Sequence, residues 1–536
     1  MKSFFILYLS LFLSQYSTSF SINNDSVINS ANKINNTLLF SKKNYIMNDK
    51  KRLLSDNDDG FHAIRIFIDK TYIISQNIVS TNVFNKVMGA IEKCVNITQK
   101  LLKVNNTEKI KFSDNDLAKL GVNPGQYDDN LLSSGQGIDA DLIIIPKFIE
   151  SNSIIALGVP IVFDQSTKRP IGGILSINKN LPTIENSVNY LESIILHQFT
   201  HILGFLDSVF NNFPGGRSKV IKIDNETRTN PQNNSPKNFI ITPKVVSYAK
   251  KYFNCSKITG VELEKEGGYD EYEDSHWEAR ILLGEYMNSE THTPEQAISG
   301  FTLALLEDSG WYKANIYTGG LMRYGKNQGC DFLYKDCEVY DDSKNKHKND
   351  FFTQNNYFGP TCTSGRQSRS YSYREDGISR GLQFRGKKIA DYCFVSDLYK
   401  YEEEKMYYVG SCNKGGGEYG QRIIYNSQTT SKNGNIPFIF GEKISSNSFC
   451  ILSSAIPTLS KINDATQYNY YLGITHPMCY PMFCSEKSLT IQVYDQYIVC
   501  PREGGIVEIK GEFLGHIYCP DFNLICTGTV MCNDMF

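Results

Sequence analysis

The chain has 536 residues, of which 41% are hydrophobic and 12% aromatic, so it can bury more than one core. Two or three domains are expected at this length. Its 55 basic and 57 acidic side chains give a net charge of −2, which argues against nucleic acid or an anionic membrane as a partner.

The N-terminus has the pattern of a secretory leader. Lys2 is followed by the apolar run Phe4–Leu13 and by small or polar residues, which predicts a signal peptide over residues 1–20. Residues 21–58 are rich in Asn, Ser and Lys and predict a pro-segment or disordered spacer. No later stretch has the length and apolarity of a membrane span, and the C-terminus lacks the apolar tail of a GPI signal. We therefore expect a secreted or cell-surface protein.

Two further features are typical of that compartment. Fourteen cysteines, twelve of them after residue 312, favour an oxidising environment, and their even number permits seven disulfides. Seven Asn-x-Ser/Thr sequons predict a glycoprotein modified on exposed loops. They lie at Asn24, Asn35, Asn96, Asn105, Asn225, Asn233 and Asn254.

Residues 59–205 combine strand and helix patterns and predict an α+β subdomain. Ile64–Ile68 alternates as a strand does, and apolar residues between Val83 and Val95 recur at helical spacing. Asp141–Pro146 and Gly172–Ile177 have the continuous apolar character of buried strands. The sequence thus predicts a sheet covered by at least one amphipathic helix.

Residues 206–312 are predicted as a second subdomain. Asn, Gly and Pro punctuate residues 206–275, which we expect to be mostly loop apart from a helical segment at Pro243–Phe253. A further helix is expected to begin at the Thr293–Pro294 capping pair and to end at Ser309.

Residues 313–536 form a predicted third, cysteine-rich domain. Short aromatic and Gly-rich segments with frequent cysteines favour strands and loops held by disulfides. Alternation over Val507–Lys510 predicts one strand there.

A helix expected from about Ile184 to Leu203, before Gly204, carries the most informative residues. His197 and His201 are four apart, so both imidazoles project from one helix face and can reach one metal ion. In the H-E-x-x-H pattern the second residue is a glutamate that acts as general base. Here that position is Gln198, whose carboxamide has no basicity near neutral pH.

A catalytic zinc site needs a third protein ligand and one open position. Of the remaining six histidines, His276 in the segment Asp274–Glu278 is the preferred candidate, with His292 as its rival. The alternative for the pair on the helix is two packed or solvated histidines without a metal. The other histidines are expected to be structural or solvated.

The chain resembles the leishmanolysin-type metallopeptidases, a metzincin group in which a long insertion displaces the third histidine. The likeness covers about residues 60–536. The segments that carry it are His197–Phe205, Ser275–Glu278, Glu285–Met287, Arg169–Gly173, Asp308–Tyr312 and the cysteine-rich tail. Because Gln198 stands where the family has its catalytic glutamate, the likeness predicts a homologue with much reduced hydrolysis.

The resemblance implies a metzincin-like body of two subdomains around a zinc cleft, followed by a disulfide-rich C-terminal domain. One zinc ion would be held by His197, His201 and His276 above a floor made by Met287. An extracellular protein or peptide substrate would lie extended along an edge strand, for which Ile154–Phe163 is the candidate. A catalytically silent pseudopeptidase that binds peptides or mediates adhesion is the alternative.

Overall fold

The computed structural model describes residues 60–520 with internal gaps, together with residues 522 and 526. The gaps are 106–107, 153, 181–189, 225–236, 266–273, 290–296, 315–321, 336–359, 364–365, 367, 373–389, 392, 394, 398, 403–404, 409–411, 413–440, 446, 459–474 and 486–487. The predicted signal peptide and spacer lie outside the described residues. Within the described part, no helix has the length and apolarity needed to cross a bilayer.

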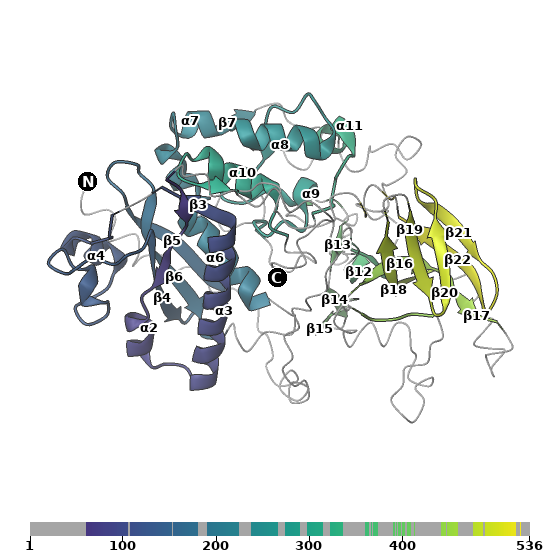
Figure 1. Ribbon diagram of the computed structural model, residues 1–536, viewed down its shortest axis with the longest axis horizontal. Helices are drawn as coiled ribbons and strands as arrows, with labels where there is room; N and C mark the ends of the chain where they lie inside the picture. Colours follow the sequence, from purple (N-terminus) through teal and green to yellow (C-terminus); the bar gives the residue numbers. More distant parts are fainter. Residues whose placement is uncertain are drawn as a thin grey trace, which may run out of the picture. The chain divides into compact units, whose positions relative to one another are not determined.

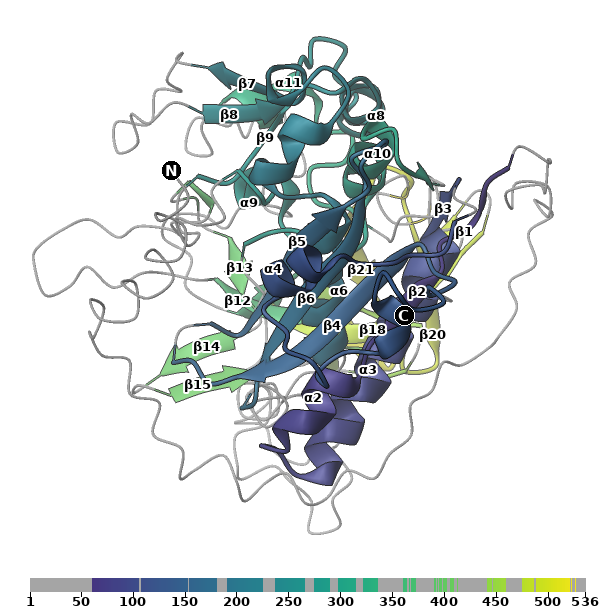
Figure 2. The ribbon, with the colours of Figure 1, turned by 90° about the vertical axis from the view of Figure 1, so that its left-hand side faces the viewer.

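A four-stranded mixed sheet, in the order β2–β4–β6–β5, is the first large element of the chain (Figures 1 and 2). Strands β2 (Ile66–Ile68), β4 (Leu142–Ile149) and β6 (Pro170–Asn178) are parallel. Strand β5 (Ala156–Phe163) runs antiparallel to β6 and forms the edge of the sheet. These strands confirm the predicted mixture of helix and sheet, and β5 confirms that the candidate segment contains an edge strand.

Two long helices pack against each other beside this sheet (Figure 1). Helix α3 (Thr81–Leu101) begins at Ser80, whose hydroxyl oxygen accepts a hydrogen bond from the Val83 amide (3.4 Å). Helix α6 (Tyr190–Leu203) ends where Gly204 takes a φ of 130°, a conformation that favours glycine. Both predicted helices are thereby confirmed; the predicted start of the second, Ile184, lies outside the described residues.

Helix α6, which carries the histidine pair, packs closely against strands β5 and β6 of the sheet. Phe199 and Ile202 of α6 are fully buried in one core with Leu175 and Ile177 of β6. A Cβ added at Gly173 would lie 2.6 Å from Cγ2 of Ile202, so the absence of a side chain there lets the helix approach the strand. Burial of each such side chain contributes about 1.5–3 kcal/mol to folding.

The opposite face of the sheet is covered by a second, smaller core that includes Phe112, Leu117, Ile143 and Ile145. Both faces of β4 are therefore buried, which explains its continuous apolar sequence. The other described elements of this region are β1 (His62–Ala63), α2 (Thr71–Gln76), β3 (Leu102–Val104), α4 (Asp114–Leu120) and the 3₁₀ helix η3 (Asp129–Leu131).

Residues 206–275 contain more regular structure than predicted. The helix at Pro243–Phe253, α8, is confirmed with proline at its first position. Elsewhere the region was expected to be mostly loop, but three short strands pair in the order β7–β8–β9. Strands of two to four residues are too short for their alternation to be distinguished from that of a loop. The elements are η4 (Asp207–Asn212), α7 (Arg217–Val220), β7 (Ile221–Asp224), β8 (Lys237–Ile240) and β9 (Val261–Glu262).

The helix predicted from Thr293 begins later than expected. Helix α10 spans Gly300–Asp308, and its first turn is capped by the Ser299 hydroxyl, which accepts from the amides of Phe301 and Thr302. Ala297 cannot belong to the helix, because its backbone pairs with Gly284 and Tyr286. Thr293 and Pro294 lie outside the described residues. The predicted last residue of this helix, Ser309, is confirmed within one residue, because α10 ends at Asp308.

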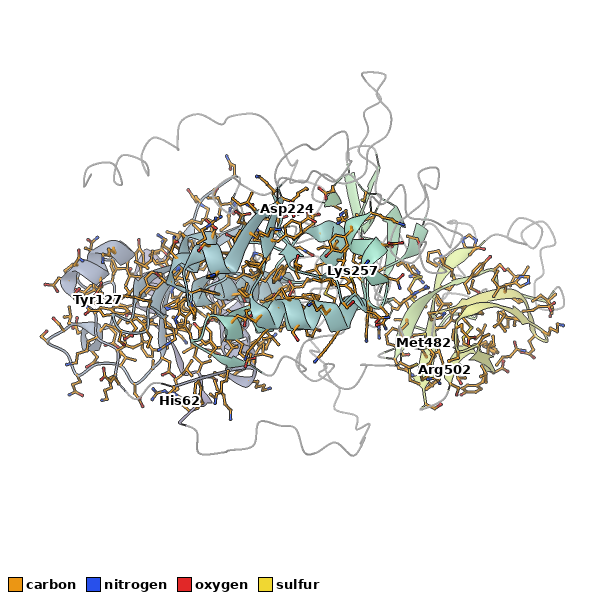
Figure 3. All side chains as sticks on the ribbon, turned by 90° about the horizontal axis from the view of Figure 1, so that it is seen from above. His62, Tyr127, Asp224, Lys257, Met482 and Arg502 are labelled. Atoms are coloured by element: carbon orange, nitrogen blue, oxygen red, sulfur yellow. A yellow bond between two sulfur atoms is a disulfide. The ribbon has the colours of Figure 1, made fainter. Side chains whose placement is uncertain are left out.

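Beyond residue 312 the described structure is mostly strand. The largest sheet has the order β17–β22–β16–β18–β19–β20, with β21 paired to β22, and it contains the predicted strand near Val507. Met482 and Arg502, labelled in Figure 3, belong to this region. Its strands are β16 (Ser448–Ser453), β17 (Ile456–Pro457), β18 (His476–Cys484), β19 (Leu489–Val493), β20 (Gln496–Cys500), β21 (Gly505–Ile509) and β22 (Phe513–Cys519).

Smaller elements join these parts of the chain. Strand β10 pairs with β3, β11 with β12, β12 with β13, and β14 with β15. The bounds of these smaller elements are α9 (Ala279–Leu282), β10 (Lys313–Ala314), α11 (Gly329–Tyr334), β11 (Pro360–Cys362), β12 (Arg369–Ser372), β13 (Ser396–Asp397), β14 (Tyr399–Glu402) and β15 (Lys405–Tyr408).

Five disulfides are present among the described residues, and Cys393 is also disulfide-bonded. The five join Cys255–Cys330, Cys362–Cys450, Cys412–Cys479, Cys484–Cys526 and Cys500–Cys519. Cys94 is a buried free thiol on α3, so the seven disulfides that the even cysteine count permits are not all formed. Asn96 is exposed on the same helix, so this sequon does not lie on a loop as predicted.

Candidate metal centre

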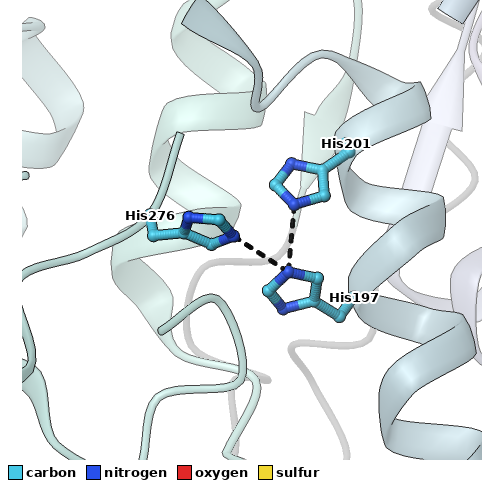
Figure 4. Close-up of side chains that lie close together, drawn as sticks. All are labelled: His197, His201 and His276. Carbon is cyan, nitrogen blue, oxygen red and sulfur yellow. Dashed lines mark hydrogen bonds between the residues drawn. The ribbon is translucent and has the colours of Figure 1, made fainter. Parts of the chain in front are cut away.

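Helix α6 presents His197 and His201 toward one point, as their spacing predicts (Figure 4). Nδ1–H of His197 donates to the Tyr286 carbonyl (2.7 Å), and Nδ1–H of His201 donates to the Phe205 carbonyl (2.7 Å). A carbonyl oxygen can only accept, so the proton of each neutral ring is on Nδ1 and the lone pair is on Nε2. Both rings are therefore held in the tautomer that binds a metal through Nε2.

His276, from the segment that precedes α9, completes the group (Figure 4). Its Nε2 lies 3.1 Å from Nε2 of His197, which in turn lies 2.9 Å from Nε2 of His201. The two α6 nitrogens cannot hydrogen-bond to each other, because both present lone pairs. Three nitrogens bound at about 2.0–2.1 Å to one tetrahedral zinc would lie roughly 3.3 Å apart, so these residues fit a divalent metal ion.

All three imidazoles are buried, with exposed fractions of 5%, 1% and 7% for His197, His201 and His276. Burial lowers the pKa of His197 to about 4, although the bond to Tyr286 opposes this shift. Burial and the neighbouring imidazoles lower the pKa of His201 and His276 well below the usual value. The rings are therefore neutral at physiological pH, which is the form that ligates metals.

The segment Glu285–Met287 lies beside the third histidine. The Trp277 amide donates to the Met287 carbonyl (3.0 Å), and the Met287 side chain is completely buried. The Glu285 carboxylate accepts from the Met287 amide and from the hydroxyls of Ser299 (2.8 Å) and Thr302 (2.7 Å). Sequence reasoning missed this role of Glu285, whose partners are distant in the chain. The floor role of Met287 stays a prediction.

Gln198 bridges helix α6 and the edge strand β5. Its side-chain oxygen Oε1 accepts a hydrogen bond from the Gly158 amide (2.7 Å). A Cβ added at Gly158 would lie 2.2 Å from the Gln198 carbonyl oxygen, so only glycine lets the strand lie this close to the helix. The residue at the position of the general base thus contacts the strand predicted to bind substrate.

Two carboxylates near the histidine pair, Glu192 in the first turn of α6 and Asp207 after its end, are engaged by cations, so neither is a candidate for the general base. Glu192 accepts from the Lys93 ammonium (2.7 Å) on α3. Asp207 pairs with Arg217 (2.7 Å). The rival ligand His292 lies outside the described residues. Of the other described histidines, His62 pairs with Asp141, and His476 and His516 belong to the C-terminal sheet.

Arg217 links the chain segment after α6 to the segment that carries His276. Its guanidinium donates to Asp207 (2.7 Å) and to Asp274 (3.0 Å), and Asp274 also accepts from the Asn238 side chain. The Asp207 amide donates to the Ser275 hydroxyl (3.1 Å). Asp274 and Ser275 directly precede His276, so this network fixes where the third ligand enters the site.

We expect Arg217→Ala to weaken the binding of Zn²⁺ by roughly 10–100-fold, the range found when a group that orients a ligand is removed. The measurement is competition with a chromophoric chelator, with circular dichroism to verify folding. Lys222→Ala is the matched control, because Lys222 pairs locally, with Asp224 (3.5 Å) on β7. Equal affinities for Arg217→Ala and Lys222→Ala would show that the network does not position His276.

A second group of acidic side chains, Glu262, Glu278 and Asp391, is also close enough to hold a cation. Two buried cations already occupy it: Lys237 lies 2.6 Å from Asp391, and Arg280 Nε lies 3.3 Å from the same carboxylate. Although burial opposes it, Glu262 and Asp391 raise the pKa of Lys237. We therefore interpret this cluster as a buried ion-pair network that stabilises the fold.

The paired helix histidines and the third histidine from a distant segment form a group that could hold a metal ion, with the buried Met287 in the segment beside it. The leishmanolysin family model matches residues 81–532, and the chain belongs to this family. That family is metal-dependent, which agrees with the three-histidine group.

Individual relatives agree with this membership. A leishmanolysin-like peptidase of Caenorhabditis elegans is 32% identical over 199 residues, which are 32% of this chain and 30% of the relative. A leishmanolysin homolog of Crithidia fasciculata is 28% identical over 386 residues, 68% of this chain and 52% of the relative. A ciliated left-right organizer metallopeptidase of Danio rerio is 24% identical over 373 residues, 67% of this chain and 50% of the relative. The chain thus matches about half or less of these relatives' lengths.

Proposed function

We propose that this protein binds one zinc ion through His197, His201 and His276 and acts on extracellular proteins or peptides with much reduced hydrolysis. The observation that supports it is the convergence of three neutral imidazoles, with a carboxamide at the general-base position. Three histidines and an open fourth position are typical of catalytic rather than structural zinc sites.

The chemistry of the donors supports zinc. Imidazole nitrogens suit zinc, although they also accept copper, iron or nickel. A zinc ion bound there would polarise a peptide carbonyl as a Lewis acid. The five disulfides support an oxidising, extracellular or cell-surface setting. Met287 is proposed as the apolar floor of a metzincin-like site built between two subdomains.

The side chain of Gln198 is the reason to propose a reduced rate of peptide hydrolysis. Its carboxamide can hold a hydrogen bond but can neither accept the proton of attacking water nor deliver one to the leaving nitrogen. General acid–base assistance contributes roughly 10²–10⁴-fold to such reactions. The remaining residues of the site would still bind and orient a ligand, so peptide binding is expected to be retained while turnover is much reduced.

Strand β5 is proposed to bind the ligand in an extended conformation, as an added strand. The Asn178 amide donates to Ile155 (2.9 Å), so Ala156, Gly158 and Pro160 present their backbone groups to the outer edge. Gly158 gives its N–H to Gln198, and Pro160 has none. A ligand strand would therefore bind chiefly by donating its own N–H groups to β5 carbonyls.

The second candidate is a catalytically silent pseudopeptidase that serves as a peptide-binding or adhesion protein, and the same residue, Gln198, favours it. A peptide hydroxamate, which chelates zinc while its side chains fill the substrate site, tests both candidates. We expect fluorescence-anisotropy binding by the zinc-loaded protein and loss of that binding after zinc removal. Equal binding with and without zinc would contradict the proposed metal-dependent peptide site.

A further inference from the structure

We propose that the metal site captures the free carboxylate terminus of a peptide, so that the protein retains cleaved peptides rather than releasing them. This inference rests on the proposed metal site and names the ligand class that it selects. The ligand is defined by chemistry: an extended peptide whose last residue ends in a carboxylate.

The charge balance of the site favours an anionic ligand. Three neutral imidazoles leave both positive charges of a divalent ion uncompensated. A glutamate at position 198 would offset one of them and repel a carboxylate, whereas Gln198 is neutral. Three acids of the segments around the site face other partners: Glu192 binds Lys93, Asp207 binds Arg217, and Glu285 binds Ser299 and Thr302.

The orientation of the Gln198 carboxamide adds hydrogen-bond selectivity. Because Gly158 N–H is a donor, the group facing β5 must be the carboxamide oxygen, at 2.7 Å. The NH₂ group therefore lies on the other side of the planar amide and has two protons to donate. A carboxylate is the acceptor-only group that matches these donors and the cation together. A glutamate held by the same Gly158 amide would present a second acceptor oxygen instead.

The backbone groups of strand β5 also suit a peptide that ends in a carboxylate. With the Gly158 amide engaged and no N–H at Pro160, the outward edge near the site offers mainly carbonyl acceptors. The amides of an extended peptide would donate to these carbonyls, while its terminal carboxylate would meet the metal and the Gln198 NH₂. Each group of the peptide then faces a complementary group of the protein.

Cobalt(II) loaded in place of zinc reports ligand binding through its visible absorption. The probes are N-acetyl-trialanine with a free carboxylate and the same peptide as its C-terminal amide. We expect the wild-type protein to prefer the carboxylate at least tenfold, and Gln198→Glu to lose or invert that preference. Gln198→Met, which is neutral but has no NH donors, should keep part of it.

Glu192→Gln is the matched control, because it changes the charge of α6 by one unit on the side facing Lys93. It should leave the preference for the carboxylate unchanged. Equal binding of both peptides by the wild-type protein, or an undiminished preference in Gln198→Glu, would overturn the inference while the metal site stands. Failure of the protein to take up cobalt at all would overturn the proposed function as well.

Discussion

Replacing Gln198 by glutamate is expected to raise the turnover of a peptide substrate by roughly 10²–10⁴-fold, the usual contribution of a general acid–base group. The substitution exchanges one NH₂ for one oxygen and leaves an acceptor for the Gly158 amide, so the side chain can keep its present position. The new carboxylate would lie beside His197 on α6 and could accept the proton from attacking water. Cleavage of casein or of a fluorogenic peptide by both zinc-loaded proteins measures the effect.

Two controls make that comparison interpretable. Zinc content is measured for both proteins, because a carboxylate near the ion also strengthens its binding modestly. Glu192→Gln is assayed in parallel and should leave turnover unchanged, because this carboxylate faces Lys93. If the wild-type protein and Gln198→Glu cleave the substrate at rates within a few fold of each other, position 198 does not limit catalysis. Another group would then have to act as the base.

The second large effect is expected from His276→Ala, which should weaken zinc binding by more than about 100-fold. Loss of a direct ligand should exceed the 10–100-fold effect of losing a group that only orients one. The α6 pair alone would leave two protein ligands where a catalytic zinc site uses three. Equilibrium competition with a chelator gives the affinity.

His516→Ala is the matched control, because His516 is an exposed histidine on β22, outside the three-histidine group. Its zinc affinity should equal that of the unmodified protein. Near-ultraviolet circular dichroism, which reports the packing of Trp277 beside residue 276, shows whether the fold is kept. An unchanged zinc affinity in a folded His276→Ala protein would mean that another side chain is the third ligand.

Local signals predicted the elements that carry the site. The spacing of His197 and His201 required only that the segment be helical, and apolar periodicity together with Gly204 predicted that helix. The edge position of β5 was inferred through family likeness and is confirmed by the strand order. For the helix, the decisive information lies in a short stretch of sequence.

The features that were missed depend on contacts between distant segments. Glu285 is bonded to Ser299 and Thr302, and Arg217 joins Asp207 to Asp274. No local pattern marks such hydrogen bonds. His276 was chosen among the six remaining histidines and is also implied by the family likeness, but no spacing rule connects it to α6.

One corrected prediction and one finding that the sequence did not reveal have the same origin. The Thr293–Pro294 pair is a plausible cap by itself, but the backbone pairing of Ala297 with Gly284 and Tyr286 delays the helix to Gly300. Cys94 sits in the core between α3 and α6, where its thiol donates to the Glu192 carbonyl (3.3 Å). Counting cysteines cannot distinguish a thiol of this kind from one in a disulfide.

A crystal structure of the zinc-soaked protein, recorded on both sides of the zinc absorption edge, examines the metal centre most directly. We expect one strong anomalous peak about 2.0–2.1 Å from Nε2 of residues 197, 201 and 276. A map without density among these rings, or one in which the third imidazole has turned away while the ion binds elsewhere, would contradict this account.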